Sequence, residues 1–197
     1  MTFRLGLTGS IGMGKSTTAA MFAAEGIPVW DADATVHRLY ATGGTAAAAI
    51  AQAFPLAMAT DGSVNRDSLR ALIAADPAVL DRVNALVHPL VAADRAAFLA
   101  AAKADIVLLD IPLLFETGAE TQCDAVAVVT APAEVQRTRL LARRTMSEAM
   151  LETLLARQMP DADKRARADY IIETLTLDSA RSAVKDVIAD IRRSAHA

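Results

Sequence analysis

The chain has 197 residues, which fits one domain or one domain with insertions and argues against a multidomain assembly. With 53% apolar residues it is not intrinsically disordered, and with 4% aromatic residues its interior must consist mainly of Ala, Leu, Val and Ile, as in helices packed on a buried sheet. The formal net charge of -3 provides no general attraction for nucleic acid, so any anion site must be local.

Features that direct a protein to a membrane or out of the cell are absent from the sequence. The first apolar run, residues 3–8, leads directly into a glycine-rich loop and lacks the basic start and long apolar core of a signal peptide. Charged residues interrupt every Ala-rich run, so no stretch reaches the roughly 18 apolar residues that span a bilayer. The single cysteine, Cys123, cannot form an internal disulfide. We therefore expect a cytoplasmic protein without membrane association.

Short apolar runs bounded by turn residues predict five strands. They are Phe3–Thr8, Ile27–Trp30, Ile106–Asp110, Ala125–Thr130 and Tyr170–Glu173. Their apolarity is continuous rather than alternating, which is typical of strands that are covered on both faces in a parallel sheet. The intervening segments have helical spacing. The predicted class is therefore α/β, a doubly wound, mainly parallel five-stranded sheet flanked by helices.

Residues 35–104 contain no strand signal. This segment is too long for a simple crossover, and its apolar spacing is too regular for a loop, so we expect a helical insertion. Gly43-Gly44 and Asp76-Pro77 mark helix boundaries within it, and residues 55–66 are rich in turn residues.

One segment in the last third of the chain is unusually basic. Residues 137–167 hold eight Lys or Arg and four Asp or Glu, a local charge of +4 that predicts a clamp for a polyanion or, alternatively, a solvated helical face.

The final helix is the clearest one, because apolar residues recur at steps of three and four on the face that we expect to pack on the sheet. They are Leu177, Ala180, Val184, Val187, Ile188 and Ile191.

The strongest motif is Gly9-Ser-Ile-Gly-Met-Gly-Lys-Ser16, a G-x-x-x-x-G-K-S loop between a predicted strand and a predicted helix. In such a loop the glycines let successive N–H groups face phosphate oxygens, and the helix adds the positive end of its dipole. Lys15 then reaches the β- and γ-phosphates, Ser16 places its hydroxyl on Mg²⁺, and Thr17 donates to the α-phosphate. The guanine-reading N-K-x-D of switch GTPases is missing and the chain is too short for most motors, so a small kinase fits best.

Two acids follow predicted strands, at the end where ligands gather in open α/β sheets. Asp33 is a candidate catalytic acid facing the phosphates and a candidate N-cap of the next helix, two roles that do not exclude each other. Asp110 ends the third strand and is either a metal-binding acid, acting through water, or a turn residue. His88 beside an apolar stripe is more typical of a packed residue than of a ligand, and His37 and His196 attract less attention still.

Seven blocks, in order, closely resemble the dephospho-CoA kinase family between residues 5 and 174. They are Leu7-Thr-Gly-Ser-Ile-Gly-Met-Gly-Lys-Ser-Thr17, Asp31-Ala-Asp33, Asp61-Gly-Ser-Val-Asn-Arg66, Val87-His-Pro-Leu-Val91, Asp110-Ile-Pro-Leu-Leu-Phe-Glu116, Arg139-Leu-Leu-Ala-Arg143 and Ala168-Asp-Tyr-Ile-Ile172. The resemblance implies transfer of the γ-phosphoryl group of ATP to the ribose 3′-hydroxyl of dephospho-CoA with Mg²⁺, and no nucleic acid or obligate protein partner. It also implies a P-loop kinase core of residues 1–34, 105–136 and 168–197, an acceptor-binding insertion of residues 35–104 and a lid of residues 137–167.

The resemblance assigns roles by position. It implies ATP binding by Gly12, Met13, Gly14, Lys15, Ser16, Thr17 and the lid residue Arg143, and catalysis by Lys15, Asp33 and Arg139. It places Asp33, Arg66 and His88 at the acceptor, and Ser16 and, through water, Asp110 at the metal.

Two segments depart from the family pattern. Arg144-Thr145 stand where Asp-Gly is usual after the lid arginine, and residues 173–176 lack the Asn and Gly found near the adenine. The alternatives are another small-metabolite or nucleoside monophosphate kinase, or a non-catalytic nucleotide sensor, which would not need the acid at Asp33.

Overall fold

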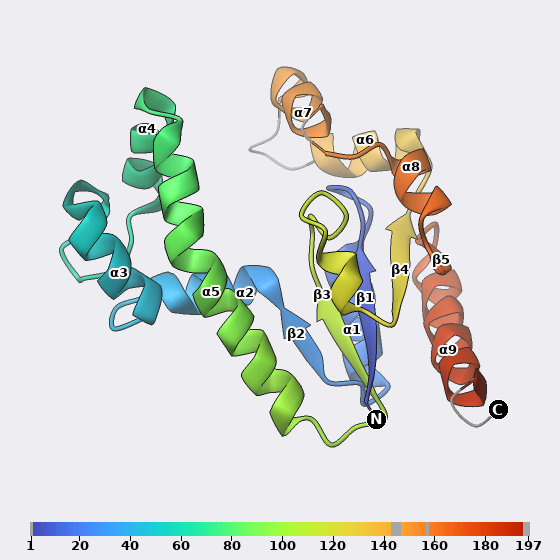
Figure 1. The fold of residues 1–197 in the computed structure, drawn as a ribbon. Coiled ribbons are helices and arrows are strands. Elements are labelled where there is room, and N and C mark those ends of the chain that lie inside the picture. Colours follow the sequence, from blue (N-terminus) through green and yellow to red (C-terminus); the bar gives the residue numbers. More distant parts are fainter. Residues whose placement is uncertain (1, 143–146, 157, 195–197) are drawn as a thin grey trace. The chain divides into compact units, whose positions relative to one another are not determined.

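The computed structural model describes residues 2–142, 147–156 and 158–194 (Figure 1). The chain divides into two compact units. Unit 1 comprises Met1–Trp30 and Ala102–Ala197, and unit 2 comprises Asp31–Ala101.

One sheet forms the centre of unit 1. Its strands are β1 (Phe3–Thr8), β2 (Val29–Asp31), β3 (Ile106–Asp110), β4 (Ala125–Thr130) and β5 (Tyr170–Glu173), in the order β2-β3-β1-β4-β5. β1 pairs in parallel with β3 and β4, and β4 with β5, so that Leu5 lies opposite both Leu108 and Ala125. All residues of β3 and β4 are buried. The predicted α/β class with a five-stranded parallel sheet is confirmed.

The bounds predicted for the second strand are wrong, because it begins at Val29 rather than Ile27 and ends at Asp31. The N–H of Ile27 donates to Phe22 O at 3.1 Å and so belongs to the turn after the preceding helix. Pro28 has no N–H to donate, although its carbonyl accepts from Leu108 N at 2.8 Å. The strand therefore starts two residues later than predicted. It ends at Asp31, directly before the next helix.

The helices of unit 1 described in the structure are α1 (Lys15–Ala24), η2 (Ala119–Gln122), α6 (Ala133–Leu141), α7 (Glu148–Leu155), α8 (Asp161–Ala166) and α9 (Leu177–Ser194). α1 and α9 pack together and share one apolar core with β1, β3 and β4. Phe22 and Val184 are fully buried there. Within the described residues, no helix is long and apolar enough to cross a membrane.

The predicted packing face of α9 is correct except at its first residue. Ala180, Val184, Val187, Ile188 and Ile191 are buried, whereas Leu177 is 62% exposed. Leu177 starts the helix just after the sheet's edge strand β5 and borders a cavity instead of the core.

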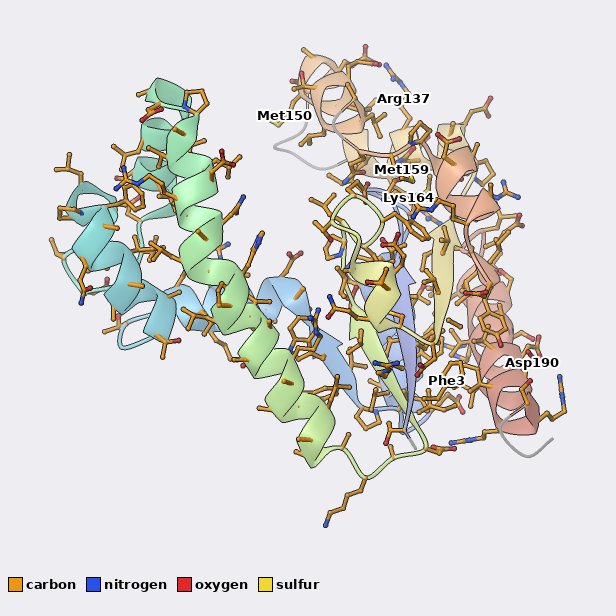
Figure 2. All side chains as sticks on the ribbon, viewed as in Figure 1. Phe3, Arg137, Met150, Met159, Lys164 and Asp190 are labelled. Carbon is orange, nitrogen blue, oxygen red and sulfur yellow. The ribbon has the colours of Figure 1, made fainter. Side chains whose placement is uncertain are left out.

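An ion pair between a buried lysine and a partly exposed glutamate joins α8 to the loop that follows β3. Lys164 is fully buried, and its Nζ lies 2.8 Å from Glu116 Oε1 (Figure 2). The N–H of Met159 donates to the same carboxylate oxygen at 3.0 Å. Burial raises the pKa of Glu116, but Lys164 and Met159 outweigh it, so the pKa lies below its ordinary value of 4.5.

We expect Lys164→Met to lower the free energy of unfolding by about 1–3 kcal/mol, because it removes the cation beside the Glu116 carboxylate, which is itself partly solvated. Arg165→Met, an exposed position on the same helix, should change it by less than about 0.5 kcal/mol, and Lys164→Met/Glu116→Leu should recover most of the loss. A carboxyl group whose pKa is lower in the folded state stabilises that state above the pKa of the unfolded chain, and the stabilisation is lost as the pH falls through the folded pKa. The difference in unfolding free energy between wild type and Lys164→Met should therefore shrink below pH 4.5. Urea unfolding at several pH values tests this. Equal losses for Lys164→Met and Arg165→Met would contradict it.

Unit 2 is helical and has a core of its own. Its elements are α2 (Ala32–Tyr40), α3 (Thr45–Ala53), η1 (Pro55–Ala57), α4 (Arg66–Ala75) and α5 (Ala78–Ala101). Ile50, Phe54 and Val83 are among the residues buried together between them. The helix boundaries predicted at Gly43-Gly44 and Asp76-Pro77 are correct. The segment is not wholly strandless, because an isolated antiparallel bridge joins Met58 to Val64.

Candidate active site

The glycine-rich loop lies between β1 and α1. Gly12 and Gly14 have φ of 80° and 93°, the left-handed region that favours glycine. A Cβ at Gly12 would lie 2.7 Å from Leu140 Cγ, so the loop has no room for a side chain there. Gly14 is the N-cap of α1 and supplies no side-chain cap, so the first turn of the helix presents its N–H groups as anion-binding donors.

Lys15 and Asp110 meet because β1 and β3 are neighbours. Leu7 lies opposite Asp110 in the register of these strands, so the loop after β1 and the end of β3 share one edge of the sheet. Lys15 Nζ lies 2.5 Å from Asp110 Oδ1, and the two side chains are 15% and 3% exposed. A carboxylate at the end of β3 thus pairs with the loop's lysine.

Two glutamines that no sequence motif marks hold the tip of the loop. Gln136 Nε2 donates to Ile11 O at 2.7 Å, and Ile11 N donates to Gln158 Oε1 at 3.0 Å. Gln136 is buried on α6 one turn from Leu140, so a polar residue on a buried helical face was an available signal. Gln158 stands in the basic segment without any such signal. Together the two glutamines bind the backbone N–H and the backbone carbonyl of Ile11.

A cavity of about 380 Å³ opens beside the loop in unit 1. Its wall is formed by the loop glycines, the first turns of α1, Arg139 and the start of α9. Arg139 donates to Thr174 Oγ1 at 2.9 Å and to Thr174 O. The Thr174 hydroxyl in turn donates to Met13 O at 2.7 Å. Thr174, at a position that departs from the family pattern, therefore links Arg139 to the loop.

Several basic residues of the segment 137–167 are held in ion pairs. Arg137 reaches from α6 to α7, where it pairs with Glu148 at 2.9 Å and Glu152 at 3.1 Å (Figure 2). Arg167 pairs with Glu120. Arg143, Arg144, Thr145 and Arg157 lie outside the described residues. Of the described basic residues in this segment, Arg139 is the one on the wall of the cavity.

Asp33 lies in the first turn of α2, in unit 2, and its side chain is exposed. The alternative that it caps this helix is wrong. Asp31 is the N-cap, because its backbone is still extended and its Oδ1 accepts from Ala34 N at 2.9 Å. Asp33 already has helical geometry, and its carboxylate is left for another role.

A second cavity, of about 460 Å³, lies within unit 2 between α2 and α4. It is lined by Asp33, Val36, Arg66, Leu69, Arg70 and Ile73. Arg66 Nη2 lies 3.2 Å from His37 Nδ1, and its guanidinium lies 5.7 Å from the centre of the Tyr40 ring. His88 is exposed on α5 and is not among the residues that line the cavity. The structure thus brings Asp33 and Arg66 together and leaves His88 apart from them.

Oxygen donors suited to Mg²⁺ are found at the glycine-rich loop. Ser16 is the second residue of α1, directly after Lys15, and the Asp110 carboxylate lies against Lys15. Hydroxyl and carboxylate oxygens match the preference of Mg²⁺, which keeps several waters and binds few protein groups beside substrate phosphates. Among the described residues, no group of three or more His, Cys, Asp or Glu is placed to hold a metal ion. The residues present therefore fit a magnesium ion carried by a nucleotide.

Known proteins resemble this chain over nearly its whole length. The family model for dephospho-CoA kinase matches residues 3–178. A dephospho-CoA kinase of Cereibacter sphaeroides is 64% identical over 195 residues, which are 99% of this chain and 98% of the relative. One of Ruegeria pomeroyi is 58% identical over 192 residues, covering 98% of this chain and 97% of the relative.

The fold is also found in solved structures. The crystal structure of TT1252 from Thermus thermophilus matches with a TM-score of 0.85 at 34% identity, over 96% of this chain and 97% of that one. Since the family model and these relatives cover both units and every block that carries the resemblance, the chain is a kinase with the P-loop fold and belongs to the dephospho-CoA kinase family.

Proposed function

We propose that this kinase transfers the γ-phosphoryl group of ATP to the ribose 3′-hydroxyl of dephospho-CoA, giving coenzyme A and ADP, the last step of coenzyme A biosynthesis. The observation that carries the proposal is the glycine-rich loop, with Lys15 2.5 Å from Asp110, in a chain that matches the family model over residues 3–178. The core is residues 1–34, 105–136 and 168–197, the acceptor insertion residues 35–104, and the lid residues 137–167. A cytoplasmic location, suggested by the single cysteine, is part of the same proposal.

The nucleotide's phosphates would lie on the loop. The N–H groups of residues 12–17 face them, Lys15 exchanges its contact with Asp110 for β- and γ-phosphate oxygens, and Thr17 binds the α-phosphate. Ser16 would hold Mg²⁺ directly and Asp110 through water. When bound, the ion neutralises charge that develops on the transferred phosphoryl group.

The acceptor hydroxyl would be oriented by Asp33. As the bond from the 3′-oxygen to the γ-phosphorus forms, the bond between that phosphorus and the bridging oxygen breaks, and its electron pair remains on ADP. The hydroxyl proton passes to the Asp33 carboxylate. Arg66 lies across the same cavity from Asp33 and binds the acceptor, whereas a role for His88 at the acceptor rests on the family resemblance.

Arg139 and Arg143 would neutralise phosphate oxygens when the lid closes. Arg139 would exchange its two hydrogen bonds to Thr174 for contacts with phosphate oxygens.

Closure should be visible as slower amide hydrogen exchange in α6 and α7 when ATP and dephospho-CoA are both present, because docking on the phosphates suppresses local opening. The amides of α9 in the core serve as the internal control and should not change. Unchanged exchange in α6 and α7 would favour the solvated-face interpretation of the basic segment.

Release of ADP from ATP, measured with and without dephospho-CoA, tests the proposed function directly. We expect release that depends on dephospho-CoA. A panel with shikimate, gluconate and nucleoside monophosphates tests the alternative of another small-molecule kinase. Turnover of one of these in preference to dephospho-CoA would overturn the proposal.

A further inference from the structure

We propose that Arg70 acts with Arg66 as a clamp for the pyrophosphate of the acceptor, which makes Arg70 a specificity-determining residue of unit 2. This inference rests on the proposed function, since it assigns a particular part of dephospho-CoA to a particular wall of the cavity. No sequence motif pointed to Arg70.

The geometry of α4 places both arginines on one face. Asn65 caps the helix through its Oδ1, which accepts from Asp67 N at 3.1 Å and Ser68 N at 3.0 Å, and so fixes where the helix begins. Arg66 and Arg70 are four residues apart, and side chains at this spacing lie one above the other. Both line the cavity of about 460 Å³.

The remaining lining residues divide the cavity by chemistry. Leu69 and Ile73 continue the same face of α4 as an apolar floor, while Asp33 and Val36 come from α2. The lining thus combines one acidic residue from α2 with two arginines from α4. This arrangement suits a molecule that carries a hydroxyl and, a few bonds away, two phosphate groups.

The present partners of the two arginines are weak competitors for an anion. Arg66 contacts the His37 ring at 3.2 Å and the face of Tyr40, and neither partner is a carboxylate. Arg70 pairs with Asp67 at 2.8 Å across three residues of one helix, with side chains 74% and 87% exposed. Such exposed pairs contribute little, so a phosphate can displace Asp67 at small cost.

Guanidinium groups recognise phosphate oxygens through two parallel hydrogen bonds, with more geometric specificity than an ammonium. In dephospho-CoA the pyrophosphate is attached to the 5′-oxygen of the ribose whose 3′-hydroxyl is phosphorylated. With that hydroxyl at Asp33, the pyrophosphate reaches the α4 wall of the same cavity. Two arginines there match its two negative charges.

Arg70→Ala tests the clamp, with Arg181→Ala as the matched control. Arg181 forms the same kind of exposed pair, with Asp178 three residues earlier at 3.0 Å, on α9. We expect Arg70→Ala to raise KM for dephospho-CoA roughly 10- to 100-fold, with KM for ATP and kcat changed less than about 3-fold. Arg181→Ala should leave all three constants unchanged, and Arg70→Lys should restore part of the loss, since it keeps the charge but not the fork.

Calorimetry without ATP separates the inference from the proposed function. Arg70→Ala should weaken binding of dephospho-CoA but not of adenosine, which lacks the pyrophosphate. Equal binding of dephospho-CoA by wild type and Arg70→Ala, or equal losses for both ligands, would overturn the clamp. Binding that depends on Arg70 without any turnover in wild type would keep the clamp and overturn the proposed function, whereas a wild type that does not bind dephospho-CoA would overturn both.

Discussion

Replacing Lys15 with alanine should lower phosphoryl transfer by roughly 10³-fold, because catalysis in such sites depends on charge neutralisation and positioning at the phosphates. The structure adds a cost in stability. Asp110 is 3% exposed and lies 2.5 Å from Lys15 Nζ, so Lys15→Ala removes a cation that pairs with a buried carboxylate. Loss of activity must therefore be separated from loss of folded protein.

Lys15→Arg makes that separation. It keeps a cation beside Asp110, so its thermal unfolding should match wild type, yet it should remain severely impaired because a planar guanidinium does not place its charge where an ammonium does. Lys185→Ala, an exposed lysine on α9 near Glu25, is the control for removal of a lysine. Steady-state kinetics with calorimetric unfolding gives both readouts. Activity of Lys15→Ala within about tenfold of wild type would show that this loop does not hold the phosphates.

Asp33→Asn should lower kcat by roughly 10² to 10⁴-fold with little change in thermal stability or ATP affinity, because an amide keeps the size of the carboxylate but cannot accept the ribose proton. The structure sharpens this test, since the helix cap is Asp31 and Asp33 is exposed. Asp33→Asn therefore leaves the cap hydrogen bond from Ala34 N in place.

Variants at Asp31 give the matched comparison. Asp31→Asn keeps the cap and should leave both activity and stability near wild type, whereas Asp31→Ala should lower stability by about 1 kcal/mol. If kcat falls in Asp31→Asn and not in Asp33→Asn, the general base is Asp31.

The sequence alone determined the strands, the helical segment and the glycine-rich loop, because each depends on neighbouring residues. Continuous apolar runs such as Ile106–Asp110 identify buried parallel strands, and the one error in strand bounds arose where the turn after α1 takes Ile27. Gly12 and Gly14 are recognisable without a structure, since the left-handed backbone they adopt is available to few other residues. The blocks that resemble the family add predictions of which residues act at the site.

Which charged residues are paired, buried or directed at a cavity was decided only by the tertiary structure. The sequence shows the basic residues of 137–167 as equivalent, yet Lys164 is fully buried against Glu116 while Arg139 lies on a cavity wall. Asp31 and Asp33 are two residues apart, and a difference in backbone conformation makes one of them the cap. Arg70 looks like half of an exposed pair until α2 and α4 enclose a cavity beside it. These roles depend on contacts between elements distant in sequence, and the burial and charge created by such contacts cannot be computed from spacing along one chain segment.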